Sequence, residues 1–95
     1  MTTDAPLAIH TDIVHPEWID YNGHMNVAYY VLAFDHATDA FFDYLDLGEA
    51  YKTKYNFSTF TLEGHITYDR EVLEGDPLTF KTYLLDYDAK RIHYF

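Results

Sequence analysis

A cluster of polar side chains precedes a long apolar segment in the first third of this chain. The stretch Asp20-Tyr21-Asn22-Gly23-His24-Met25-Asn26 brings together a carboxylate, two carboxamides and an imidazole. Because Asp20, Asn22 and His24 alternate, an extended segment would turn them to the same side. A helix beginning directly behind them would add unpaired N–H groups and the positive end of its dipole. This combination suits chemistry in which negative charge develops on a carbonyl oxygen.

The segment behind the cluster has the spacing of a long helix. Residues 26–47 are predicted to be helical, with Asn26 as the N-cap and Gly48 as the residue that stops the helix. The apolar residues at 3–4 spacing, which we expect to face the core, are Tyr30, Phe34, Ala37, Phe41 and Leu45. Aspartates at similar spacing on another side repel weakly, so the helix must gain its stability by burying its apolar face.

Strand patterns lie on both sides of the predicted helix. Alternation predicts a strand over 8–14, which Pro16 ends. After a connector at 49–55, the predictions are a long strand at 57–70 with a bend at Gly64, a turn at 73–77, a strand at 78–85, a turn at 86–89 and a strand at 91–95. The order is therefore strand, long helix and a three-stranded meander.

Composition excludes several classes of function. The formal net charge is −10, which makes nucleic acid a poor partner. No Lys or Arg precedes Lys52, so an anionic ligand must be held by the second half, by helix amides or by a neighbouring subunit. Cysteine is absent, which rules out disulfides, thiolate metal ligands and a Cys nucleophile. The histidines outside the cluster show no ligand spacing, so we predict no metal site.

The remaining features bear on domains, location and partners. We predict a flexible N-terminus at 1–7 and one domain over 8–95, truncated because the chain stops within a strand pattern. No run reaches transmembrane length and no signal segment precedes the domain, so we predict no membrane association and a cytoplasmic location. The 10 Tyr and 7 Phe predict that a second subunit covers part of the aromatic surface.

The strand, the polar cluster, the long helix and the meander together resemble the hot-dog fold. The resemblance is greatest to the acyl-CoA thioesterases of the 4-hydroxybenzoyl-CoA thioesterase-like group and covers 8–95. It implies an α+β domain in which a curved antiparallel sheet wraps one long central helix, here without its C-terminal strands. It also implies an acyl-CoA substrate with a short or medium acyl group, no cofactor, and a homodimer or larger homo-oligomer with sites at the subunit interface.

The same resemblance suggests catalytic residues. Asp20, Asn22 and His24 are similar to the Asp-x-Asn-x-His string of plant-type acyl thioesterases, in which a Glu in an Arg-Glu context joins them. Arg70-Glu71 matches that context. In the aryl-CoA branch the catalytic Asp is the second of an Asp-x-Asp pattern, where this chain has Asn22. The base or nucleophile is therefore left open between Asp20 and Glu71.

A role can be predicted for each group of the cluster. Amides near Met25 and Asn26, at the helix N-terminus, would form an oxyanion hole. One of the two carboxylates would act as general base, or as a nucleophile that forms an anhydride. His24 would donate a proton to the carbonyl or the leaving thiolate. Asn22 would hold the water or the carbonyl.

Aromatic residues around the cluster suggest the type of acyl group. An aromatic site in an acidic half of the chain would attract a quaternary ammonium group through cation–π contacts. The cluster and the following Thr59–Tyr68 run also resemble thioesterases of carnitine catabolism, which act on betainyl-CoA. The predicted substrate contacts are Trp18, Tyr21, Met25, Asn26 and Tyr29.

Other interpretations of the same residues remain open. Asp20 and Asn22 could only cap and turn the chain before the helix, and His24 could be structural. At the level of the domain, the alternatives are a non-catalytic module that binds acyl-CoA or mediates dimerisation, and a hot-dog dehydratase. Release of thiol, ligand binding without release, and hydration of an enoyl-CoA distinguish the three.

Overall fold

The computed structural model describes residues 6–95 of the chain. The elements are β1 (Leu7–Ile13), η1 (Pro16–Trp18), α1 (Val27–Tyr44), α2 (Glu49–Tyr55), β2 (Pro77–Thr82), β3 (Leu84–Tyr87) and β4 (Ile92–Tyr94). Residues 1–5 of the predicted flexible N-terminus lie outside the described residues. Leu7, which was also predicted to be flexible, already belongs to β1.

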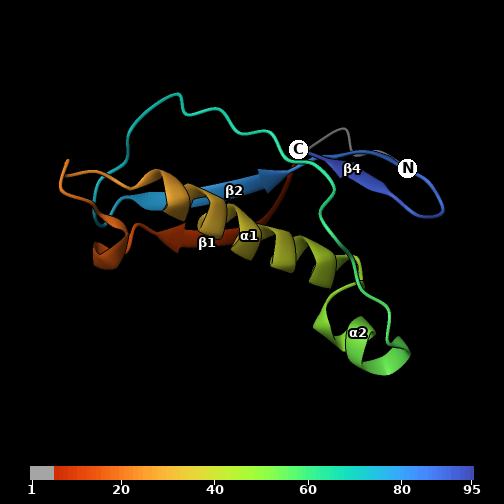
Figure 1. The fold of residues 1–95 in the computed structure, drawn as a ribbon. Coiled ribbons are helices and arrows are strands. Elements are labelled where there is room, and N and C mark those ends of the chain that lie inside the picture. Colours follow the sequence, from red (N-terminus) through yellow and green to blue (C-terminus); the bar gives the residue numbers. More distant parts are fainter. Residues whose placement is uncertain (1–5) are drawn as a thin grey trace.

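The long helix lies across an antiparallel strand pair (Figure 1). β1 pairs with β2 in a register that places Ile13 opposite Pro77 and Leu7 opposite Thr82. This confirms the strand predicted at 8–14. β3 and β4 form a second antiparallel pair, which Figure 1 shows beyond the end of β2. The fold is therefore α+β, with one long helix packed on antiparallel strands.

The buried face of α1 follows the predicted spacing in part. Tyr30 and Leu45 are half-buried, and the buried Ala33 was not among the predicted residues. Ala33, Ala37 and Phe41 are buried, and Phe41 is fully inaccessible. Phe34 was also predicted to face the core, but 47% of it is exposed. Its ring instead meets the edge of the Phe80 ring on β2, with centroids 5.8 Å apart. Small alanines therefore occupy the centre of the contact and let the helix approach the strands closely.

The polar cluster is anchored to the core at both of its ends. Trp18 and Met25 are 4% and 3% exposed and belong to one buried group with Val14 and Ala33. Leu78 and other half-buried residues of the strand pair pack against this group. Burial of the two flanking side chains holds the intervening loop at the N-terminal end of α1.

The C-terminal end of α1 differs from the prediction. Asp46, not Gly48, takes the left-handed conformation after the helix, with φ of 59°. The Leu47 N–H donates to the Phe42 carbonyl at 2.8 Å, and the Asp46 N–H donates to the Asp43 carbonyl at 3.1 Å. These two bonds form a Schellman motif, which satisfies the last carbonyls without a glycine. Gly48 instead caps α2, a helix that replaces the connector predicted at 49–55.

The strand predicted at 57–70 does not form. This segment is irregular and runs as an extended coil from α2 back toward the start of α1 (Figure 1). Phe60 and Leu62 are 87% and 78% exposed. Within residues 6–95 no strand lies hydrogen-bonded beside it, because β1 pairs with β2 and β3 pairs with β4. An alternating sequence gives a segment side chains suited to the two faces of a sheet. A strand also needs a neighbouring strand whose backbone it can hydrogen-bond to.

The strand predicted at 78–85 is divided into β2 and β3 at Tyr83. Before this residue the chain pairs with β1, and at Tyr83 it begins to pair with the C-terminal segment. Tyr83 and Phe95 exchange two backbone hydrogen bonds of 2.7 and 2.8 Å. One continuous sequence pattern therefore serves two different partners. β4 confirms the strand predicted at 91–95.

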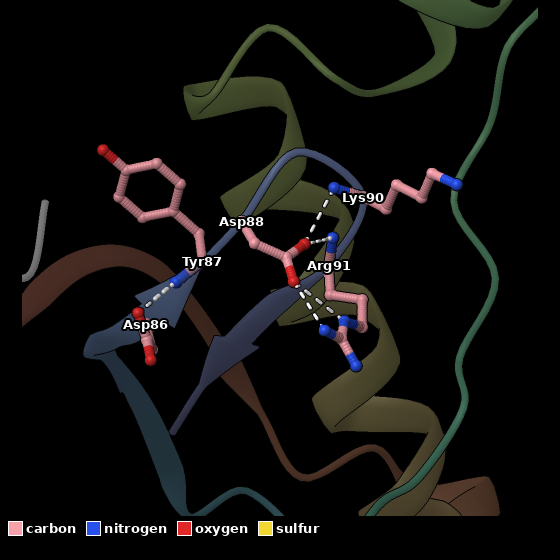
Figure 2. Close-up of polar contacts among 5 residues, drawn as sticks. All are labelled: Asp86, Tyr87, Asp88, Lys90 and Arg91. Atoms are coloured by element: carbon pink, nitrogen blue, oxygen red, sulfur yellow. Dashed lines mark hydrogen bonds and ion pairs between the residues drawn. The ribbon is translucent and has the colours of Figure 1, made fainter.

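The turn between β3 and β4 is held by one carboxylate. Asp88 accepts hydrogen bonds from the backbone N–H groups of Lys90 and Arg91 and from the Arg91 guanidinium, at 2.7–2.9 Å (Figure 2). The backbone bond from Lys90 and the Arg91 side chain lower the pKa of Asp88 to about 2. The ionised carboxylate thus closes the turn that positions β4.

We expect Asp88→Asn to lower the thermal unfolding midpoint of the full-length protein at pH 7. The carboxamide cannot accept four hydrogen bonds from the turn, and it loses the ion pair with Arg91. Because the folded-state pKa is depressed, this stabilisation is complete above the unfolded value near 3.8 and disappears as the pH falls through about 2. The difference in midpoint between wild type and variant should therefore shrink over that range.

Asp86→Asn is the matched control for this prediction. Asp86 lies in the same hairpin, is exposed, and among residues 6–95 accepts only from the neighbouring Tyr87 N–H (Figure 2). Its replacement should leave the midpoint close to wild type. Equal effects of the two substitutions would show that loss of charge, and not loss of the hydrogen bonds that close the turn, lowers the unfolding midpoint.

Candidate active site

The polar cluster folds into a tight loop, not an extended segment. Ile19 and Met25 face each other as an isolated antiparallel bridge, and the chain reverses between them. The Gly23 N–H donates to the Asp20 carbonyl at 3.0 Å, and the Asp20 N–H donates to the His24 carbonyl at 3.2 Å. Gly23 has φ of 85°, a conformation that glycine adopts without a steric penalty. These hydrogen bonds therefore fix the backbone of the loop immediately before α1.

The Asp20 carboxylate is engaged within this loop. Its Oδ1 accepts from the Asn22 N–H at 2.8 Å, and its Oδ2 accepts from the Asn26 side-chain amide at 3.0 Å. These hydrogen bonds, first that from the Asn26 side chain, lower the pKa of Asp20. Asp20 is therefore ionised at neutral pH with a partner for each oxygen.

Glu71 joins the loop from a distant part of the sequence. The Met25 N–H donates to the Val72 carbonyl at 2.9 Å, so the segment that carries Glu71 is tied to the loop by a backbone bond. The His24 Nε2 and the Glu71 Oε2 lie 3.9 Å apart. Both side chains are accessible, His24 at 38% and Glu71 at 64%. The structure thus brings together an imidazole and a carboxylate that a ligand can reach.

The amides predicted to form an oxyanion hole are already used. The Met25 N–H donates to Val72, and the Asn26 N–H donates to the Trp18 carbonyl at 2.9 Å. That prediction is therefore wrong for these two residues. The N-cap prediction is confirmed, because the Asn26 Oδ1 accepts from the Ala28 N–H at 3.0 Å. Within residues 6–95, the Val27 N–H has no hydrogen-bond partner. It is the helix amide available to a ligand oxygen.

The other predicted site residues divide into exposed and buried ones. Within the loop, Asn22 is exposed and Tyr21 is 97% exposed. Tyr29, in the first turn of α1, is half-buried. Trp18 and Met25 lie in the core, where the Trp18 ring is flanked by His15 at 4.2 Å and Tyr29 at 6.0 Å between centroids. Their burial gives these two residues a packing role, so they are not available as substrate contacts in this structure.

Within residues 6–95, no three His, Cys, Asp or Glu side chains are grouped so that they could hold a metal ion. No helix in the same range is both long and apolar enough to cross a bilayer.

Val27 and Val72 are positions at the candidate site that the sequence prediction did not include. An N-cap at Asn26 implies that the next residue opens the helix with an unpaired amide, so Val27 follows from the capping pattern. The side chain of Val72 packs against the core, but its contact with the loop is made by its carbonyl, and no side-chain pattern identifies such a contact.

An α+β fold with one long helix on antiparallel strands, and a polar loop at the helix N-terminus, defines a protein of the hot-dog class. Residues 14–95 match the sequence model of the thioesterase-like superfamily, and the chain belongs to this family. The predicted fold class and family are thereby confirmed.

Two curated relatives are similar to this chain over most of its length. The chain is 44% identical over 80 residues to a betainyl-CoA thioesterase of Pseudomonas aeruginosa, covering 84% of this chain and 50% of the relative. It is 40% identical over 89 residues to an L-carnitine dehydrogenase/betainyl-CoA thioesterase of Agrobacterium fabrum, covering 94% of this chain and 18% of the relative. The chain thus spans half or less of the length of these curated relatives.

A solved structure gives the same result for the fold. A protein of Pseudomonas putida KT2440, a candidate thioesterase, superimposes with a TM-score of 0.80 at 36% identity. The match covers 94% of this chain and 58% of the Pseudomonas putida chain.

Proposed function

We propose that this chain carries the catalytic loop of an acyl-CoA thioesterase. The observation that supports this most directly is the approach of the His24 Nε2 to the Glu71 Oε2, 3.9 Å apart, at the N-terminal end of α1. The name thioesterase, carried by relatives up to 44% identical, supports the same activity. An accessible carboxylate, an imidazole and an unpaired helix amide are the groups that hydrolysis of a thioester needs.

In the proposed reaction Glu71 acts as the general base. It removes a proton from water while the water oxygen forms a bond to the thioester carbon, and the carbonyl electrons move to oxygen. The Val27 N–H donates to the oxyanion that results. Collapse of this intermediate breaks the C–S bond, and the leaving thiolate takes a proton from the His24 imidazolium. Glu71 can return its proton to His24, which restores the starting state.

Glu71 fits the role of base better than Asp20. Each oxygen of Asp20 already accepts a hydrogen bond in the loop, whereas the Glu71 carboxylate contacts only His24 within residues 6–95. If the carboxylate is instead a nucleophile, Glu71 is still the accessible one. Asn22, exposed beside the loop, is proposed to orient the water or the carbonyl.

We further propose that the acyl group is betainyl, with a quaternary ammonium. The relatives named for betainyl-CoA support this, as does a loop region with aromatic side chains and no basic residue before Lys52. Tyr21 and Tyr29 are the accessible aromatic rings beside the loop. Arg70, exposed and without an ion pair in the described range, is a candidate for the CoA phosphates. A homo-oligomer and a cytoplasmic location stay predictions.

The test compares two acyl groups of the same shape. We expect kcat/KM of the full-length protein to be at least about 10-fold higher for betainyl-CoA than for 3,3-dimethylbutanoyl-CoA, in which carbon replaces the ammonium nitrogen. Because the ammonium also withdraws electrons from the thioester carbonyl, the ratio is divided by the ratio of the uncatalysed hydrolysis rates, and the remainder measures recognition of the cation. Thiol release is followed with a chromogenic trap.

Three other results of this comparison would each lead to a different conclusion about the activity. Equal rates would contradict a betainyl specificity but leave thioesterase activity in place. Binding of both acyl-CoA molecules without thiol release would indicate a non-catalytic module. Hydration of an enoyl-CoA would indicate a dehydratase.

A further inference from the structure

The Asp20 carboxylate connects three parts of the loop that are not adjacent in sequence. Its Oδ1 holds the Asn22 N–H at 2.8 Å, and its Oδ2 holds the Asn26 Nδ2 at 3.0 Å. The second bond spans six residues and closes a ring of chain that contains His24. A carboxylate used in this way is part of the support of the loop.

The Asn26 carboxamide transmits this support to the helix. Its Nδ2 donates to Asp20, and its Oδ1 accepts from the Ala28 N–H at 3.0 Å. The bond to Asp20 therefore fixes which end of the carboxamide faces α1. If the amide were reversed, its NH₂ group would face a backbone N–H, and both the cap and the link to Asp20 would be lost.

The same backbone positions the two reactive side chains. His24 lies inside the ring closed by Asp20 and Asn26, and the next residue, Met25, is bound to the Val72 carbonyl at 2.9 Å. Glu71 precedes Val72, so a shift of the loop changes the separation between His24 and Glu71. The start of α1, with its unpaired Val27 amide, moves with Asn26.

We infer that Asp20 is a positioning residue, which acts through Asn26 to hold His24 and the first amide of α1 in place for the reaction, and not a base or a nucleophile. This inference rests on the proposed function. It assigns different roles to Asp20 and Glu71, which the sequence left as alternatives for the base or nucleophile. Each oxygen of Asp20 accepts a hydrogen bond within the loop, whereas Glu71 is 64% exposed and lies beside His24.

The test is a double-mutant cycle with Asp20→Asn and Asn26→Ala in the full-length protein. An asparagine at position 20 has one acceptor oxygen and cannot hold both N–H partners, while its size is nearly unchanged. We expect each single variant to lose about 10-fold in kcat, with KM within about twofold, the scale of one charge-assisted hydrogen bond. The double variant should be no slower than the slower single one, because both substitutions break the same link.

A pH profile provides the second readout. Under this inference Asp20→Asn lowers the kcat/KM profile at every pH and keeps its acidic limb, because another group is the base. Loss of the acidic limb would make Asp20 the base and overturn the inference. Fully multiplicative effects in the double variant would overturn it as well. Asp35→Asn, on the exposed side of α1, is the charge control and should keep kcat within about twofold.

Failure of the proposed function gives a different result from failure of this inference. If the wild-type protein releases no thiol from any acyl-CoA, the proposed activity is wrong. The link is then tested alone by the NMR resonances of the Asn26 side-chain amide. Asp20→Asn should shift these resonances, and unchanged resonances would show that the link does not exist.

Discussion

Replacing Glu71 by Gln is expected to lower kcat for betainyl-CoA at least ~100-fold, or about 2.7 kcal/mol of transition-state stabilisation. The carboxamide has nearly the same size and leaves the Met25–Val72 backbone bond in place, so binding should change little. It cannot take a proton from water and cannot form an anhydride, and therefore both routes through Glu71 are closed. Steady-state thiol release measures kcat and KM separately.

Glu74→Gln is the matched control for this substitution. Glu74 is exposed in the turn that follows, three residues from Glu71, and carries the same charge. Its replacement should leave kcat within about twofold, as is usual for surface positions. If Glu71→Gln behaves like this control, Glu71 takes no part in the reaction, and the proposed base must be sought elsewhere.

The two routes through Glu71 differ in where water oxygen arrives. In repeated turnover in H₂¹⁸O, a general base places the label only in the released acid. A nucleophile forms an anhydride, and attack of water on the Glu71 carbonyl of that anhydride leaves ¹⁸O in the Glu71 carboxylate. Mass spectrometry of the peptide that contains Glu71 separates these results. Label in the Glu71 carboxylate would establish the nucleophilic route.

Replacing His24 by Gln is expected to lower kcat for a CoA thioester ~100-fold, the usual loss for a general acid. An alkyl thiolate leaves slowly without a proton, and the imidazolium supplies it in the proposed reaction. A thiophenol ester releases a more stable thiolate that needs no proton. The same variant should therefore lose less than about 10-fold with the thiophenol ester.

The dependence on the leaving group separates an acid from a structural histidine. A structural His24 would slow both substrates equally, because the loop would be displaced in both cases. Such a result would contradict the assigned role. His36→Gln, on the exposed side of α1, controls for the loss of an imidazole and should not affect either rate.

The long helix and its cap could be predicted because local rules determine them. Asn26 has the side chain that an N-cap needs, and the spacing of Ala37 and Phe41 identifies the face that the structure buries. The end of the helix was less predictable. Asp46 adopts a left-handed conformation that glycine more often supplies, because two bonds to the last turn outweigh its steric cost.

The strands were predictable only where a partner is present. β1 formed because β2 lies beside it, whereas the equally regular pattern of 57–70 remained without a neighbour among the described residues. Pairing is a property of two segments, and a single segment carries only half of the information. For the same reason the break at Tyr83 could not be found from the sequence, which continues its alternation through it.

At the site, sequence reasoning identified the groups but not their connections. His24 and Glu71 were both predicted, and the structure places them 3.9 Å apart. The turn bond from the Asn22 N–H to Asp20 was among the alternatives that the sequence left open, but the bond from the Asn26 side chain depends on the exact reversal of the loop. Side-chain types indicate what chemistry is possible, and backbone geometry decides which side chains are free to perform it.

The link between the Met25 N–H and the Val72 carbonyl joins main-chain atoms only. Any residue except proline at position 25 can make the same bond, so substitutions around the loop do not by themselves disturb it. Main-chain atoms alone therefore hold the segment of Glu71 against the loop of His24, and the spacing of these two backbones tolerates changes in the side chains around them.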